Sequence, residues 1–197
     1  MTEVEWLSCT DPREMWDIVA KCPRASDRTF RLYVAAFWGW QAHRLRPEQQ
    51  ADLQKRVASM DHWAEMGKLP KGVRKSRSEN VIFFGRSAQQ AARITIYAPG
   101  GWGSEAPAAF AIQPLLLRDI FGNPFQKFVF SPDWRTDTVL TLALQMYESR
   151  DFSAMPILAD ALQDAGCDND EVLNHCRATN ALHVRGCWVV DLVLGKH

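Results

Sequence analysis

The stretch SDRTFRLYVAAFWGWQAHRL, residues 26–45, decides the fold class. Ser26 is a preferred helix N-cap residue, and the apolar residues after it recur three and four positions apart, which predicts a helix over about Asp27–Leu45. Trp38 and Trp40 point to different faces of that helix, so burying both requires a central helix or one with a face at an interface. Its apolar stripe consists of Phe30, Tyr33, Val34, Phe37 and Trp40.

Helix signals continue on both sides of this stretch. Capping residues predict a short helix from about Thr2, and Asp11 followed by Pro12 predicts a second helix over about Pro12–Lys21. Pro47 opens a further amphipathic helix that ends near Gly67. Beyond residue 107 the helical pattern returns, and it predicts helices over Leu115–Phe121, Thr136–Ser149, Pro156–Ala165, Glu171–Arg177 with Asp168 as cap, and His183–Gly195.

The middle of the chain has a weaker pattern. Lys68–Asn80 is basic and aperiodic, which indicates a loop or linker, and VIFF at 81–84 is too short to assign. Gln89–Tyr97 combines helical and strand-like spacing, and Ala98–Pro107 has the Gly and Pro content of turns. We therefore predict an all-α, compact helical domain, with a short strand or hairpin in the middle as an open alternative.

This pattern divides the chain into three parts. Residues 1–67 form an N-terminal helical half, residues 68–107 a basic and Gly/Pro-rich connection, and residues 108–197 a C-terminal helical half. We expect all three to belong to one structural unit, because 197 residues are enough for one good-sized domain.

Composition argues against several classes of protein. The 23 basic residues equal the 23 acidic ones, so no net charge attracts nucleic acid or an anionic membrane. The opening MTEVEWLSCTDP has no secretory-signal pattern, and no apolar run approaches the roughly 18 residues that a membrane helix needs. Five cysteines, an odd number, favour reduced thiols, so we expect a cytoplasmic protein without a membrane partner.

Three long motifs carry a family resemblance. They are TEVEWLSCTDPREM at the start, LLLRDIFGNPF at 115–125, and PILADALQDAGC with the later HCR and HVRGCWVVDLVLGK near the end. The chain resembles a large family of small uncharacterised proteins encoded many times over in planctomycete bacterial genomes. The resemblance covers roughly Thr2–Arg31 and Leu115–Lys196, and Lys68–Gly103 departs from it. It implies a bacterial lineage and a cytoplasmic setting, and it implies no catalytic residue.

The block Pro156–His197 concentrates cysteine and histidine. Zinc prefers four Cys or His ligands, and His183 and Cys187, four positions apart on the predicted last helix, can reach one point. Against a metal site, the block has no CxxC pair and matches no standard zinc-finger spacing, so buried structural thiols are the alternative. The candidate zinc ligands are Cys167, Cys176, His183 and Cys187, with His175 as a substitute.

The same block allows a thiol-enzyme interpretation. His183, Cys187 and Asp191 fall on one face of the predicted last helix, and together they supply the groups that thiol catalysis uses. Residues stacked along a single helix rarely converge as a catalytic triad does, because the attack geometry needs groups from different elements.

Two further features suggest binding. The basic residues of the connection could contact phosphate, although nothing there supplies a recognition helix or stacking platform, which favours a solvated loop. Trp102, in the Gly-rich turn, is a candidate anchor for a protein partner. The candidate nucleic-acid contacts are Lys68, Lys71, Arg74, Lys75 and Arg77.

Three functional hypotheses remain open from the sequence. The first is a helical protein–protein interaction or accessory module without catalysis, and it rests on the helix-rich, tryptophan-rich and charge-balanced composition. The second is a small zinc-stabilised domain with nucleic-acid contact. The third is a thiol enzyme centred on Cys187.

Overall fold

A computed structural model describes residues 1–73, 87–97, 106–127, 129–178 and 181–196. Every regular element in these ranges is helical, and none is a strand, which confirms the all-α prediction. The ambiguous segment near Gln89 is helical, as α6 (Ala88–Tyr97). The segment 81–84 and most of the Gly-rich turn lie outside the described ranges.

The chain divides into two compact units, Met1–Phe125 and Gln126–His197. This division differs from the halves expected from the sequence, because α7 (Ala106–Phe121) belongs to the first unit and not to a C-terminal half. The Gly- and Pro-rich composition of 98–107 suggested a boundary there, yet the chain returns after it to pack α7 against α3 and α2. The boundary between the units falls after the Gly-Asn-Pro sequence that ends α7.

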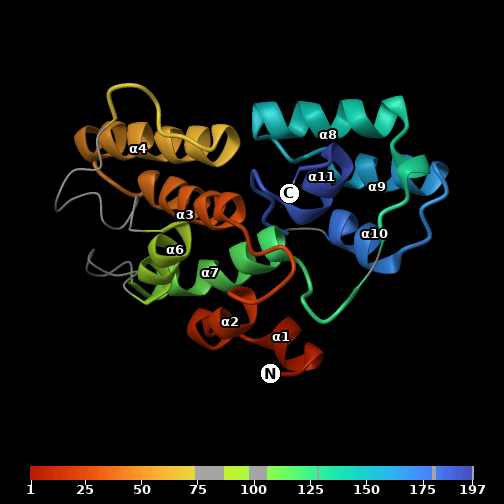
Figure 1. Ribbon diagram of the computed structural model, residues 1–197, viewed down its shortest axis with the longest axis horizontal. Helices are drawn as coiled ribbons and strands as arrows, with labels where there is room; N and C mark the ends of the chain where they lie inside the picture. Colours follow the sequence, from red (N-terminus) through yellow and green to blue (C-terminus); the bar gives the residue numbers. More distant parts are fainter. Residues whose placement is uncertain (74–86, 98–105, 128, 179–180, 197) are drawn as a thin grey trace. The chain divides into compact units, whose positions relative to one another are not determined.

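The first unit is built around α3 (Asp27–Ala42), which packs against α4 (Pro47–Met66), α6 and α7 (Figure 1). This helix therefore occupies the centre of the first unit. Trp38 is buried, whereas Trp40 is half-buried, with the Arg44 guanidinium 3.5 Å from its ring centroid. Two shorter helices, α1 (Glu3–Ser8) and α2 (Pro12–Val19), precede α3.

Local capping explains where these helices start and stop. Thr2 and Glu5 form the expected capping box, with the Thr2 amide donating to Glu5 Oε2 at 2.6 Å. The Asp11 carboxylate accepts from the Arg13 amide and begins α2. Gly67 ends α4 in the left-handed conformation, with φ of 66°.

Two side chains tie the first unit together over long sequence separations. The buried Tyr33 hydroxyl donates to Gln113 Oε1 at 2.7 Å, which joins α3 to α7. The Arg118 guanidinium donates to the carbonyl oxygens of Trp6 at 2.6 Å and Cys9 at 2.5 Å, which holds the segment after α1 against α7. Burial lowers the pKa of Arg118.

In the residues that the structure describes, the second unit contains four α-helices and a short 3₁₀ helix, Pro132–Trp134. Each α-helix contacts the next one along the chain. The last, α11, packs against the first, α8, so these contacts form a closed ring (Figure 1). Arg135 closes the end of α11 by donating to the carbonyls of Leu192 at 2.8 Å and Val193 at 2.9 Å. The helices are α8 (Asp137–Ser149), α9 (Met155–Asp164), α10 (Asp170–Arg177) and α11 (Trp188–Leu194).

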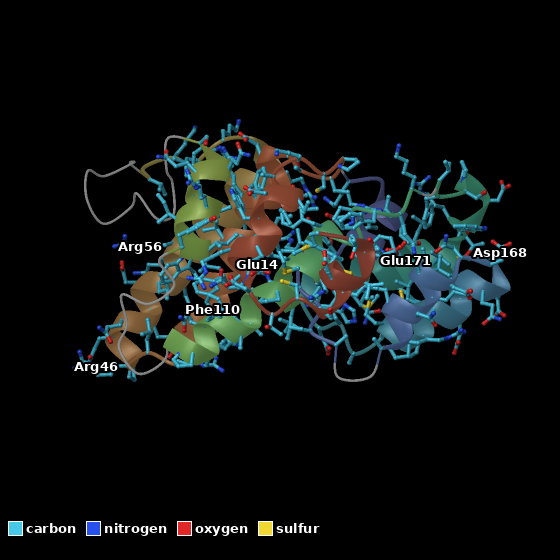
Figure 2. The ribbon with its side chains drawn as sticks, turned by 90° about the horizontal axis from the view of Figure 1, so that it is seen from below. Glu14, Arg46, Arg56, Phe110, Asp168 and Glu171 are labelled. Atoms are coloured by element: carbon cyan, nitrogen blue, oxygen red, sulfur yellow. The ribbon has the colours of Figure 1, made fainter. Side chains whose placement is uncertain are left out.

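Two predictions for this unit were wrong in detail. Asn169, not Asp168, caps α10 by accepting from the Val172 amide at 3.0 Å, and Asp168, labelled in Figure 2, is exposed. The last helix starts at Trp188 and not at His183.

None of the helices in the described ranges combines the length and the apolar character that crossing a bilayer requires.

The buried hydrogen bond between Tyr33 and Gln113 gives a test of the first unit. Tyr33→Phe leaves Gln113 Oε1 buried without its donor, so we expect the free energy of unfolding to fall by about 1–3 kcal/mol. Urea denaturation followed by circular dichroism measures the change. The double variant Tyr33→Phe/Gln113→Leu removes both partners and should recover part of the loss; an unchanged free energy in Tyr33→Phe alone contradicts this role.

Candidate metal centre

The centre begins on α10. This helix is amphipathic, and its inward residues Val172, Leu173 and Cys176 lie in the core of the second unit. His175 is in its last turn, half-buried, and its ring lies 5.2 Å from the Trp188 ring. The buried side of α10 thus holds the helix in the core. His175, next to the buried Cys176, places its imidazole at the edge of that core.

A tight turn, Val184–Cys187, positions the other two donor residues, because His183 directly precedes it and Cys187 ends it. The Cys187 amide donates to the Val184 carbonyl at 2.9 Å, and Gly186, third of the four turn residues, has φ of 97°. A positive φ at that position fits a type II turn, which glycine adopts without the steric cost of a Cβ. The turn leads directly into α11, and Cys187 is the residue immediately before that helix.

The turn and α10 bring three donor atoms together. His175 Nε2 lies 3.2 Å from Cys187 Sγ, and His183 Nδ1 lies 3.9 Å from the same sulfur. One ligand atom from each of the three residues lies within 4.8 Å of the other two. The two imidazole rings meet edge to face, with centroids 4.9 Å apart. The three side chains therefore surround one point from two separate elements of the second unit.

The environment of the sulfur is apolar on one side. Cys187 is 0% exposed and Trp188 is 3% exposed, whereas His175 and His183 are half-buried. A metal ion held here would have the thiolate on its inner side and the imidazoles nearer the surface. That order suits the chemistry, because a neutral imidazole tolerates partial exposure and a buried thiolate needs a nearby cation.

The donor spacing fits a zinc ion. Zn–S bonds of about 2.3 Å and Zn–N bonds of about 2.0–2.1 Å at a tetrahedral angle place sulfur and nitrogen about 3.6 Å apart. The two observed sulfur–nitrogen distances, 3.2 and 3.9 Å, lie on either side of that value. A thiolate with two imidazoles favours zinc, copper or cobalt over magnesium and calcium, which prefer oxygen ligands.

The structure brings together only part of the ligand set expected from the sequence. His175, His183 and Cys187 converge, but no group of three or more close donor atoms in the described ranges includes Cys167 or Cys176. Both of these cysteines are buried in the core of the second unit, as small apolar side chains. Burial raises the pKa of the Cys167 thiol, and the Asp168 charge raises it further.

The helical-face argument for His183, Cys187 and Asp191 was wrong. His183 lies in the irregular segment before the turn, and Asp191 is buried within α11. His183 and Cys187 are nevertheless close, because the turn folds the chain back over four residues. No local pattern indicated the contact between Trp188 and His175, because it joins residues of two separate elements.

The other candidate binding residues fall elsewhere. Lys68 and Lys71 are exposed in the segment after α4, in the first unit. The remaining candidates, Arg74, Lys75, Arg77 and Trp102, lie outside the described residues.

In comparisons with known proteins, no family model, curated protein or solved structure matches the chain. The chemistry of the three converging side chains is therefore the observation that bears on function.

Gly186→Ala tests whether the turn sets the position of Cys187. A Cβ at this φ is strained, so we expect the free energy of unfolding to fall by about 1–3 kcal/mol. We also expect Cys187 to react faster with a thiol reagent, as measured by mass spectrometry of the labelled peptide. Gly166→Ala is the matched control, because Gly166 also has a positive φ, 87°, and ends α9 away from the turn. Equal labelling of Cys187 in the two variants would show that the turn does not control it.

Proposed function

We propose that the second unit binds a transition-metal ion, with zinc as the first candidate, through His175, His183 and Cys187. The observation that carries this proposal is the convergence of the three donor atoms within 4.8 Å of one another. These atoms come from α10 and from residues 183 and 187 ahead of α11, so the ion would cross-link two parts of the unit that are separate in sequence.

The alternative without metal is a hydrogen bond between Cys187 and His175 inside a packed core. Their 3.2 Å separation is compatible with that bond. A hydrogen bond needs only one imidazole, however. The second imidazole also approaches the Cys187 sulfur, with His183 Nδ1 at 3.9 Å. Two imidazoles beside one buried sulfur supply three ligands of the kinds that zinc binds, and this supports the metal.

Metal binding of this kind stabilises a fold. Because the three donors come together only in the folded unit, the free energy of binding adds to the free energy of folding. Of the three hypotheses from the sequence, this supports the zinc-stabilised domain. None of the five cysteines forms a disulfide, which suits the cytoplasmic setting that we propose for it.

The hypotheses that remain draw less support. The candidate nucleic-acid residues Lys68 and Lys71 lie in the first unit, and neither is among the three donors. Catalysis by Cys187 as a free nucleophile would require a substrate to reach a residue that is 0% exposed. A non-catalytic interaction module is compatible with a structural metal ion.

Metal titration of the purified, metal-free protein tests the proposal. We expect one zinc ion per chain, a raised melting temperature on zinc addition, and a sulfur-to-metal charge-transfer band when cobalt replaces zinc. His175→Ala, His183→Ala and Cys187→Ala should each weaken binding by about 100-fold, or about 2.7 kcal/mol, because each removes a ligand. The charge-transfer band should vanish only in Cys187→Ala.

Cys167→Ala is the control, since Cys167 is a buried thiol of the same unit outside the donor group. It should lower stability and leave the affinity for zinc unchanged. A wild-type chain that binds no zinc, cobalt or copper at micromolar concentrations overturns the proposal. Equal loss in Cys167→Ala and Cys187→Ala also overturns it, because a specific thiolate ligand would then be absent.

A further inference from the structure

Arg185 lies inside the turn Val184–Cys187, which His183 directly precedes and Cys187 ends. It is two residues after His183 and two before Cys187, so it lies midway between the two donors along the chain. Its guanidinium carbon lies 4.4 Å from the centroid of the Tyr147 ring. Within the described residues, Arg185 Nε is buried without a hydrogen-bond partner, so the aromatic ring is what this part of the guanidinium faces.

Tyr147 is suited to hold such a group in place. It lies near the end of α8, is 2% exposed, and belongs to the core of the second unit. Lys196 Nζ lies 4.6 Å from the centroid of the same ring. The ring thus contacts one cation from just before α11 and one from just after it, so both ends of that helix are held against α8.

The strength of this contact is enough to matter. A cation over an aromatic ring contributes more to stability where water is excluded than at an exposed site. Arg185 is only partly exposed and the ring is buried, which places this contact among the stronger ones. Outer groups that orient metal ligands typically change metal affinity by about 10–100-fold when removed.

We propose that Tyr147 is a positioning residue of the metal centre, which holds the ligand-bearing turn through Arg185. This inference rests on the proposed metal binding. In this proposal the ring supplies no ligand; it fixes Arg185, and Arg185 fixes the spacing between His183 and Cys187. Affinity then depends on an aromatic side chain on α8, a helix that supplies no ligand.

Three variants separate positioning from packing. Tyr147→Phe keeps the ring and should bind cobalt within about threefold of wild type. Tyr147→Leu keeps an apolar side chain without the ring and should weaken binding by about 10–100-fold. Arg185→Gln removes the cation and should have a similar effect. The double variant Tyr147→Leu/Arg185→Gln should be no weaker than the stronger single variant, because both changes remove one interaction.

Val139→Ala is the matched control for lost core packing. Val139 is a fully buried, aliphatic residue of α8 that belongs to the same core. It should lower the melting temperature and leave the cobalt affinity and the charge-transfer band unchanged. Tyr147→Leu should also alter the position of that band, which a purely structural role would not do.

The outcomes are distinct for the two proposals. If wild type binds no metal, both fail. If wild type binds metal and Tyr147→Leu binds it equally well, only the positioning role fails. The positioning role fails also if Val139→Ala loses as much affinity as Tyr147→Leu. Should Tyr147→Leu not fold, the comparison of Arg185→Gln with wild type decides, and an unchanged affinity there overturns the inference.

Discussion

The hydrogen bond from the Cys187 amide to the Val184 carbonyl closes the turn on which the proposed metal centre depends. It forms only because Gly186 adopts a positive φ of 97°, which a side chain would resist. With the turn closed, Cys187 sits against His175 and directly precedes α11. The position of the sulfur is therefore set by backbone geometry, and its surroundings are set by the packing of Trp188.

The core of the second unit turns this local geometry into a rigid site. Its four helices contact one another in a closed ring, so α10 and α11, which carry or flank the donors, are each held by a second neighbour. Arg135 fixes the end of α11, and the Tyr147 ring lies under cations on both sides of it. A preorganised donor set loses less entropy on binding an ion, and this is why elements without ligands bear on affinity.

Local signals in the sequence predicted much of the fold. The Thr2–Glu5 capping box, the Asp11–Pro12 start and the Gly67 stop are interactions within a few residues, so a single sequence contains them. The start of α11 was not predictable in this way, because the apolar run 188–194 continues a helical pattern back to His183 and the positive φ of Gly186 interrupts it. The unit boundary depends on α7 packing against α3, a non-local contact.

The three donors were all candidates from the sequence, and how they come together was not predicted. His183 and Cys187 were expected together for a helical reason and meet through a turn, while Cys167 and Cys176 fill the core. X-ray absorption spectroscopy of the zinc-loaded protein tests the resulting ligand set most directly. We expect one sulfur at about 2.3 Å and two imidazole nitrogens at about 2.0–2.1 Å. Two or more sulfurs, or no sulfur, around the zinc would contradict a centre built from His175, His183 and Cys187.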